Sequence, residues 1–116
     1  MKIIDLIIDE DNLIRYEEYV DLNEYVDNVK DIISCFSESN IVNIDDVESY
    51  LNDGYLKDDD NNINEKMKLI GCLVNIKKLL KDNENYVLVE YNVEYDNSFL
   101  LIDKNDYVKL FEMGNV

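Results

Sequence analysis

The segment Ile63 to Lys81 constrains the fold more than any other part of the chain. Its apolar side chains recur with helical spacing in two adjacent rows. The first row consists of Ile63, Met67, Ile70 and Val74, and the second consists of Leu69, Leu73, Ile76 and Leu80. Because two adjacent rows make an apolar arc wider than that of an ordinary amphipathic helix, other elements should cover this helix on most sides. We therefore expect it to be the central helix of a small domain.

Two further helices are predicted before this segment. The apolar residues of Leu22 to Glu38 lie on one helical face, and Asp21 precedes them as an N-cap with Glu24 at capping-box spacing. Residues 45–52 form a shorter amphipathic segment that Gly54 follows as a helix-ending residue. The polar stretch between these two segments is expected to be a linker.

Strands are predicted at both ends of the chain. Residues 1–9 are predicted to form a strand because they contain an apolar run of strand length. Residues 13–19 are expected to return as the second strand of a hairpin, with the start of a helix as the alternative. In Tyr86 to Tyr95, Val and Tyr residues alternate with other side chains, which predicts the clearest strand.

The last 20 residues have two interpretations. Residues 98–102 predict a strand, and residues 107–113 are most simply a third strand, which gives a C-terminal antiparallel β-meander. A short helix capped by Asp103 competes for the final segment. With 116 residues, enough for a single core, we expect one α+β domain over residues 1–116. Two main helices and a short one would pack on its antiparallel sheet.

The net charge of −16 is concentrated in the first half of the chain. Residues 1–60 contain 18 acidic residues and four basic ones, a net charge of −14, whereas residues 61–116 contain nine acidic residues and seven lysines, a net charge of −2. A field of this sign repels nucleic acid and anionic membranes and attracts basic proteins. We therefore expect a basic protein as partner, with no direct binding to nucleic acid or membrane.

Catalytic and metal-binding patterns are missing. The chain has no histidine, which excludes mechanisms that need an imidazole base or ligand within this chain. Residues 58–64 alternate acids and amides as a calcium loop does, but Ile63 occupies the glycine position and Leu69 replaces the bidentate glutamate. Carboxylate pairs such as Glu17 and Glu18 do not stand out among 27 acids. We expect no enzymatic activity, no metal and no cofactor.

Several features indicate a cytoplasmic protein. Cys35 and Cys72 fall on apolar helical faces without a C-x-x-C motif, as structural free thiols do in a reducing compartment. Residues 1–11 have too short an apolar patch and too many acids for a signal peptide. No apolar run approaches the roughly 20 residues that a membrane helix needs. The lack of Ala, Thr, Gln, Pro and Trp is typical of a low-GC bacterial or phage genome.

The leading functional hypothesis is a non-enzymatic acidic inhibitor of a basic, nucleic-acid-handling protein. It would be an immunity protein or antitoxin against a nuclease toxin, or a phage anti-defence inhibitor of the anti-CRISPR kind that acts as a DNA mimic. The protein would be a monomer or a small homo-oligomer. The alternative is a structural or assembly subunit that forms homo-oligomers through an exposed edge strand such as Tyr86 to Tyr95. A small carboxylate-based hydrolase is a third possibility.

The partner-binding residues are predicted among the acids and tyrosines of the first half. Tyrosines ringed by acids are typical of interfaces with Lys/Arg-rich partners, although they also cover core edges with their hydroxyls in water. The predicted residues are Tyr16, Glu17, Glu18, Tyr19, Asp21, Glu24, Asp27 and Asp31, with Asp58, Asp59 and Asp60 as a second group.

Overall fold

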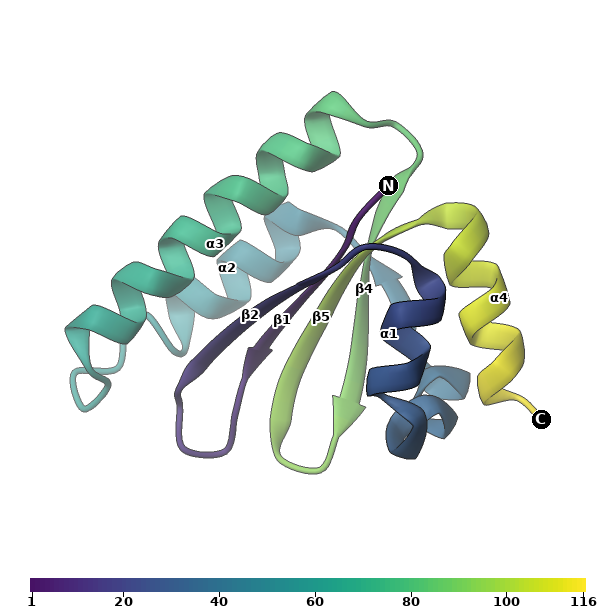
Figure 1. Ribbon diagram of the computed structural model, residues 1–116. Coiled ribbons are helices and arrows are strands. Elements are labelled where there is room, and N and C mark those ends of the chain that lie inside the picture. Colours follow the sequence, from purple (N-terminus) through teal and green to yellow (C-terminus); the bar gives the residue numbers. More distant parts are fainter.

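A five-stranded antiparallel sheet with helices on both faces makes up the fold in the computed structural model, which describes all 116 residues (Figure 1). The strands are β1 (Ile3–Ile8), β2 (Ile14–Tyr19), β3 (Asn40–Val42), β4 (Tyr86–Val93) and β5 (Asp96–Asp103), in the spatial order β2-β1-β5-β4-β3. The predicted α+β class and the predicted β1–β2 hairpin are therefore confirmed.

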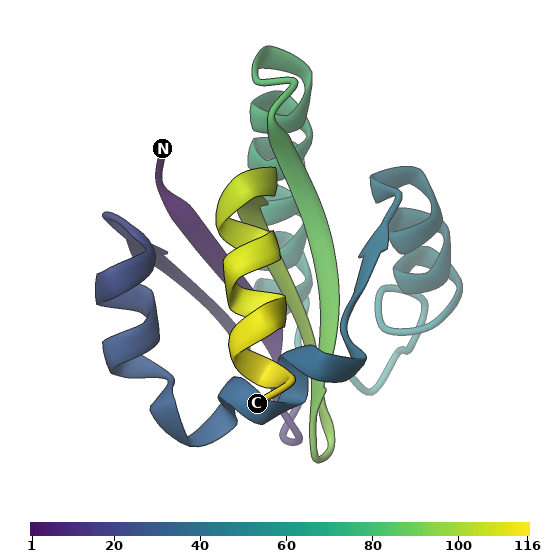
Figure 2. The same cartoon turned by 90° about the vertical axis from the view of Figure 1, so that its right-hand side faces the viewer.

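The helices form the two outer layers (Figures 1 and 2). One face of the sheet carries α2 (Ile44–Asp53) and α3 (Ile63–Asp82). The other face carries α1 (Leu22–Asn28), the 3₁₀-helix η1 (Lys30–Glu38) and α4 (Lys104–Gly114). None of the helices combines the length and the apolar character needed to cross a membrane.

The strands β1 and β5 separate two cores. In β1, Ile4 and Leu6 pack toward α2 and α3, whereas Ile3 packs toward α1, η1 and α4. In β5, Leu101 and Leu100 alternate between the same two cores. Because both faces of these strands are covered, their sequences are almost continuously apolar rather than alternating.

The local signals at the first helix are confirmed. Asp21 Oδ1 accepts a hydrogen bond from the Glu24 N–H at 2.9 Å. Glu24 Oε2 in turn accepts from the Val20 N–H at 2.7 Å, which ties down the residue before the cap. The helix ends sooner than predicted, however, because Val29 leaves the helical region with φ −121° and the chain continues as the 3₁₀-helix η1. The segment predicted as a linker contains β3, which pairs with residues Leu88–Glu90 of β4.

Of the predicted C-terminal meander, the antiparallel pair β4–β5 is confirmed, but the third strand predicted over residues 107–113 is wrong, because this segment is helix α4, the alternative prediction. The side chain of Asp103 caps it by accepting from the Asn105 N–H at 2.9 Å. The strand β5 already pairs with β1 on one side and β4 on the other, so no free edge is left beside it for a further strand. Tyr107 and Leu110, three residues apart, instead bury one helical face in the core around η1.

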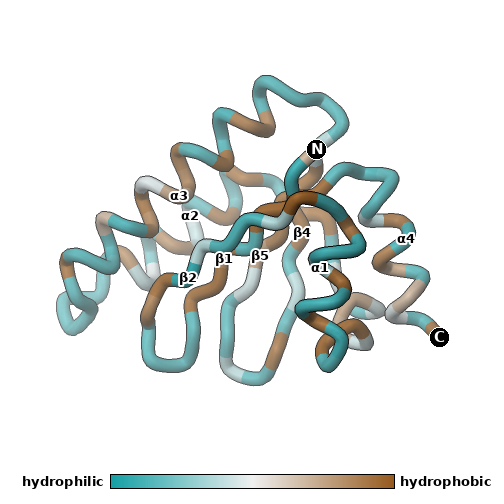
Figure 3. The backbone as a smooth tube through the Cα atoms, in the orientation of Figure 1, coloured by the Kyte–Doolittle hydropathy of each residue, from teal (hydrophilic) through white to brown (hydrophobic).

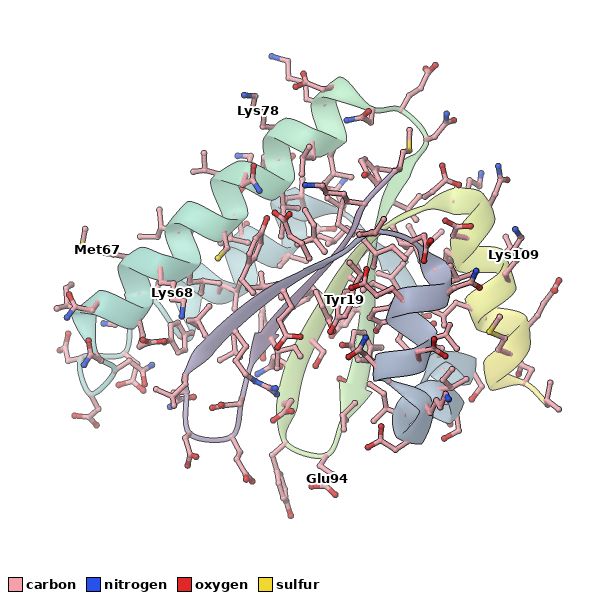
Figure 4. The ribbon with its side chains drawn as sticks, viewed as in Figure 1. Tyr19, Met67, Lys68, Lys78, Glu94 and Lys109 are labelled. Carbon is pink, nitrogen blue, oxygen red and sulfur yellow. The ribbon has the colours of Figure 1, made fainter.

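The position predicted for the long helix is also wrong. In α3 the row of Leu69, Leu73 and Ile76 is buried, but the row of Ile63, Met67, Ile70 and Val74 faces solvent, with 49% to 67% of each residue exposed. Apolar residues recur along the whole length of this helix (Figure 3), and Met67 projects away from the sheet (Figure 4). The helix α3 is therefore an outer helix with an unpartnered apolar row.

The strand at Tyr86 to Tyr95, expected to form an exposed edge of the sheet, is not an edge strand. The strand β4 pairs with β5 along its length and with β3 over three residues, so the edges of the sheet are β2 and β3. Over Leu88–Glu90, β3 therefore occupies the edge of β4 through which self-association was predicted.

Candidate functional site

Three acidic turns lie together at one end of the molecule, which we call the acidic end. The β1–β2 turn contributes Asp9, Glu10 and Asp11, the α2–α3 connection contributes Asp58, Asp59 and Asp60, and the β4–β5 turn contributes Glu94 together with Asp96, the first residue of β5. In Figure 1 the β1–β2 and β4–β5 turns lie at the bottom of the view and the α2–α3 connection lies at its left end, and Figure 4 labels Glu94 at the tip of the β4–β5 turn.

Hydrogen bonds between the turns hold the acidic end together. Asn12 Nδ2 donates to Asn61 Oδ1 at 2.9 Å, and the Tyr55 hydroxyl donates to the Asn12 carbonyl at 2.8 Å. These two bonds join the first turn to the α2–α3 connection. The Glu10 N–H donates to Asp96 Oδ1 at 3.1 Å, which joins the first turn to the β4–β5 turn. The three segments are distant in sequence, and only the tertiary structure brings them together.

Some acids of this end are used to form the turns themselves. Asp9 Oδ1 accepts from the N–H groups of Asp11 and Leu13 at 2.9 and 3.0 Å. Asp58 Oδ1 accepts from the Asp60 N–H at 2.9 Å, and both arrangements are typical of aspartate in turns. Five exposed acids of this end accept no hydrogen bond with their side chains and form no ion pair. They are Glu10, Asp11, Asp59, Asp60 and Glu94. These five carboxylates are the ones that can meet a partner.

A cavity of about 270 Å³ opens beside the acidic end, on the sheet face that carries α1 and η1. Asp5, Tyr91 and Ser98 are buried residues that line it, and part of the wall consists of apolar residues from β1, β4, η1 and the position between α1 and η1. The exposed rim includes Arg15 and Glu17 of β2.

The buried carboxyl of Asp5 is the most perturbed acid of the protein. It lies in the middle of β1, on the same face as Ile3, and is only 4% exposed. The Tyr91 hydroxyl donates to Asp5 Oδ1 at 2.7 Å. Burial raises the pKa of Asp5 from 3.8 to about 7, and the nearby charge of Glu17 adds to the rise, while the Tyr91 hydrogen bond and Arg15 oppose it. This group therefore titrates near neutral pH.

Aromatic rings hold this polar cluster in place. Tyr25 and Phe36 meet edge to face with ring centroids 6.2 Å apart, and Phe36 packs on Tyr91 at 4.6 Å. The Tyr19 ring meets Tyr25 at 5.1 Å, and its hydroxyl donates to Glu17 Oε2 at 2.6 Å. Burial raises the pKa of the Tyr25 and Tyr91 hydroxyls above 10.0, so both stay protonated and can donate hydrogen bonds.

The structure divides the predicted partner-binding residues among several places. Asp58, Asp59 and Asp60 belong to the acidic end, as described above. Glu17, Tyr19 and Asp31 line the cavity. The remaining five have local structural partners.

Two of these five lie on the opposite face of β2. The Tyr16 hydroxyl accepts a hydrogen bond from Asn75 of α3, and Glu18 pairs with Lys2 at 3.3 Å. The other three lie on α1.

Of the three residues on α1, two form its N-terminal cap. They are Asp21 and Glu24, whose hydrogen bonds are given above. The third, Asp27, pairs with Lys30 at 3.7 Å. The predicted residues therefore do not form one continuous surface.

Sequence reasoning missed most of the acidic end and the floor of the cavity. The residues concerned are Asp9, Glu10, Asp11, Glu94 and Asp96 in the acidic end, and Asp5, Tyr91 and Ser98 in the cavity. One usable signal was present, because Asp5 is a single charge in an otherwise apolar run of strand length. No sequence signal shows that the three turns meet.

Comparisons with known proteins assign no function to these sites. No protein-family model, no curated protein and no solved structure matches the chain.

Proposed function

We propose that the protein is a non-enzymatic acidic inhibitor that binds a basic, nucleic-acid-handling protein through the acidic end. The observation that carries the proposal is the meeting of the three turns. Residues 9–15, 57–60 and 94–97 contain eight carboxylates against Arg15 and Lys57. Arg15 lies 3.7 Å from Asp96 and is thereby already paired. The acidic end thus has a strong net negative charge on three segments that hydrogen bonds join.

The physical basis of inhibition is the replacement of phosphates by carboxylates. Lysine and arginine side chains that line a nucleic-acid channel form charge-assisted hydrogen bonds with either group. Carboxylates on three neighbouring turns present several such acceptors at once, and the net charge of −16 steers a basic partner toward the protein. Either version fits, an immunity protein or antitoxin against a nuclease toxin, or an anti-CRISPR-type inhibitor that acts as a DNA mimic.

The cytoplasm is the compartment that we propose. Cys35 lies in η1 and Cys72 in α3, on opposite faces of the sheet, and both are free thiols. Two cysteines separated by the sheet cannot form an intramolecular disulfide, which supports a reducing compartment.

Charge reversal tests the proposed interface. The variant Glu10→Lys/Asp59→Lys/Asp60→Lys changes three exposed acids of the acidic end. The matched control Glu38→Lys/Glu84→Lys/Glu112→Lys makes the same change in net charge at exposed acids elsewhere. Tagged wild-type protein first captures its partner from the lysate of a low-GC bacterium, and salt elutes the partner. The affinity of the purified partner is then measured for the wild type and for both variants.

Location-specific loss of affinity is the expected result. The acidic-end variant should bind the partner at least about a hundredfold more weakly, because each lost ion pair becomes a repulsion, whereas the control should lose less than about tenfold. The wild-type protein should also block nucleic-acid binding or cleavage by the partner. Equal losses in the two variants, or a partner that remains active in the complex, would contradict the proposal.

A second candidate function is assembly into a homodimer, which the exposed apolar row of α3 favours. Asp59 and Asp60 precede this helix, and Lys77, Lys78 and Lys81 lie in its last turns. Two antiparallel copies of α3 would place the acids of each beside the lysines of the other. Gly71 lies at the middle of the helix, and the space around its Cβ position is open, so a second helix can approach closely there.

A further inference from the structure

The floor of the cavity beside α1 and η1 contains one buried hydroxyl without a partner, that of Ser98, and a second such hydroxyl, that of Tyr25, lies outside the residues that line the cavity. Ser98 is 1% exposed and Tyr25 is 0% exposed, and neither hydroxyl makes a hydrogen bond. Ser98 lines the cavity and lies between its cross-strand neighbours, Ile7 on β1 and Tyr91 on β4. A buried polar group left unpaired costs about 1–3 kcal/mol, and a polar ligand in this cavity can satisfy it.

Two carboxylates lie side by side on the sheet at the same cavity. Asp5 on β1 and Glu17 on β2 are direct cross-strand partners, and both line the cavity. Like charges in this arrangement destabilise a sheet. The Tyr91 hydroxyl donates a hydrogen bond to Asp5 Oδ1, and the Tyr19 hydroxyl donates one to Glu17 Oε2. The second oxygen of each carboxylate makes no hydrogen bond within the protein, so a cation between the two would offset their repulsion.

The character of the cavity selects among cations. A hard metal ion needs six or more oxygen ligands, and no group of three or more carboxylate or thiol side chains is placed to hold a metal. Part of the wall is apolar, with Val29, Ile32 and Val93 beside the polar floor. The volume of about 270 Å³ is smaller than the roughly 300 Å³ at which drug-sized pockets begin. A small organic cation with an aliphatic stem matches all three features.

We infer that this cavity binds an alkylguanidinium or alkylammonium group, whose N–H donors bond the free oxygens of Asp5 and Glu17 while its stem contacts the apolar wall. The Ser98 hydroxyl becomes a further partner of the bound head group. The cavity lies on the sheet face and shares only Arg15 and Asp96 with the acidic end, and its floor of Asp5 and Ser98 takes no part in the proposed partner interface, so the inference goes beyond the proposed function. The same head group occurs in small free molecules and in the arginine and lysine side chains of proteins.

Titration with small cations tests the inference without any partner protein. The probes are agmatine as a free alkylguanidine, N-acetyl-arginine methylamide as a protein-like side chain, and N-acetyl-citrulline methylamide as a neutral isostere of the latter. Binding to the full chain is followed by calorimetry and by NMR shifts of backbone amides at pH 8, where Asp5 is charged. At least one cationic probe should bind about tenfold or more tightly than the citrulline compound and shift the amides of Ser98 and Tyr91.

Variants locate the binding in the cavity. Asp5→Asn should weaken binding of the cation by about tenfold or more, whereas Asp59→Asn, the same charge change at the exposed acidic end, should change it by less than about twofold. Ser98→Ala keeps the charge of the cavity and removes the unpaired hydroxyl, and it should weaken binding of the cation about threefold or more. This variant replaces Asp5→Asn as the test if Asp5→Asn fails to fold.

Each outcome has one meaning. Binding of agmatine without the blocked arginine identifies a free small molecule as the ligand, and comparable binding of both identifies a protein side chain as a ligand of the site. Equal affinity for arginine and citrulline, or equal losses in Asp5→Asn and Asp59→Asn, would overturn the inference. Because no partner is present, failure here leaves the acidic-end proposal unaffected, and failure of the charge-reversal experiment leaves the cavity unaffected.

Discussion

At the scale of single residues, the informative positions are those where a residue occupies an environment that its type avoids. Asp5 is a carboxyl buried in an apolar strand, and Glu94 is a glutamate with a positive φ of 51° in the β4–β5 turn. Each is unfavourable for folding by itself. Both lie at or beside the sites described above, which is where such unfavourable positions tend to be retained.

The pKa of Asp5 predicts a pH-dependent stability. Because its folded pKa is raised to about 7 from 3.8, the stabilising neutral form is fully present below about pH 4 and is lost as the pH rises through 7. A shift of this size corresponds to about 4 kcal/mol. Asp5→Asn does not titrate, so its free energy of unfolding relative to the wild type should rise by roughly that amount between pH 4 and pH 8.

Urea unfolding at several pH values measures this difference. Asp59→Asn is the control, since it removes an exposed acid and should follow the wild-type curve with pH. A difference between Asp5→Asn and the wild type that stays constant from pH 4 to pH 8 would show that Asp5 titrates normally.

The turn position of Glu94 predicts a stabilising substitution. Glycine adopts positive φ without the steric cost that a side chain brings, so Glu94→Gly should raise the free energy of unfolding by roughly 0.5–1 kcal/mol. Glu94→Gln removes the charge but keeps the side chain, and it separates the backbone effect from relief of repulsion at the acidic end. Thermal and urea unfolding measure both. If the two variants are equally stable, the backbone conformation is not the cause.

At the scale of elements, helix packing distinguishes the two faces of the sheet. The helix α4 approaches η1 so closely that a Cβ added at Gly114 would lie 2.7 Å from the Ser37 backbone nitrogen and 2.9 Å from the Ile33 carbonyl oxygen. The helix α3 has the opposite character, because its outer side is uncovered and a Cβ at Gly71 meets nothing within 4 Å.

This contrast predicts opposite effects for one substitution. Gly114→Ala should destabilise the protein by about 1–3 kcal/mol, since rigid backbone atoms must move apart. Gly71→Ala should stabilise it by roughly 0.5–1 kcal/mol, because alanine is the better helix former and nothing obstructs its side chain. Chemical denaturation of the two variants against the wild type measures both. A stabilised Gly114→Ala variant would mean that α4 and η1 are packed less closely than described.

At the scale of the whole molecule, an acidic surface and an apolar surface adjoin each other. The acidic end and the exposed row of α3 meet where Asp59 and Asp60 precede Ile63, and they favour different associations. The first favours a basic partner whose binding weakens with salt, and the second favours a second copy of the chain.

Light scattering tests the homodimer directly. A homodimer through α3 has twice the chain mass of 13.7 kDa, and Ile70→Asp should reduce it to the monomer mass because a buried charge opposes apolar pairing. Tyr95→Asp, at an exposed tyrosine of the β4–β5 turn, is the matched control and should leave the mass unchanged. A monomer mass for the wild type at high micromolar concentration would exclude this candidate.

The sequence by itself determined the elements whose signals are local. The capping of α1 by Asp21, the β1–β2 hairpin and the extent of α3 depend on residues within a few positions of one another, and all three were predicted. The antiparallel α+β class followed from the order and type of those elements.

Tertiary structure decided everything that depends on which surfaces meet. Residues 107–113 suit a strand by simple pattern, but β5 already has two neighbours, so Tyr107 and Leu110 bury a helical face instead. The first apolar row of α3 is exposed because no element packs outside it. The acidic end and the paired carboxylates of Asp5 and Glu17 exist only because strands and turns distant in sequence become neighbours in the sheet. Such contacts leave no periodic trace in the sequence, since no single segment contains both partners.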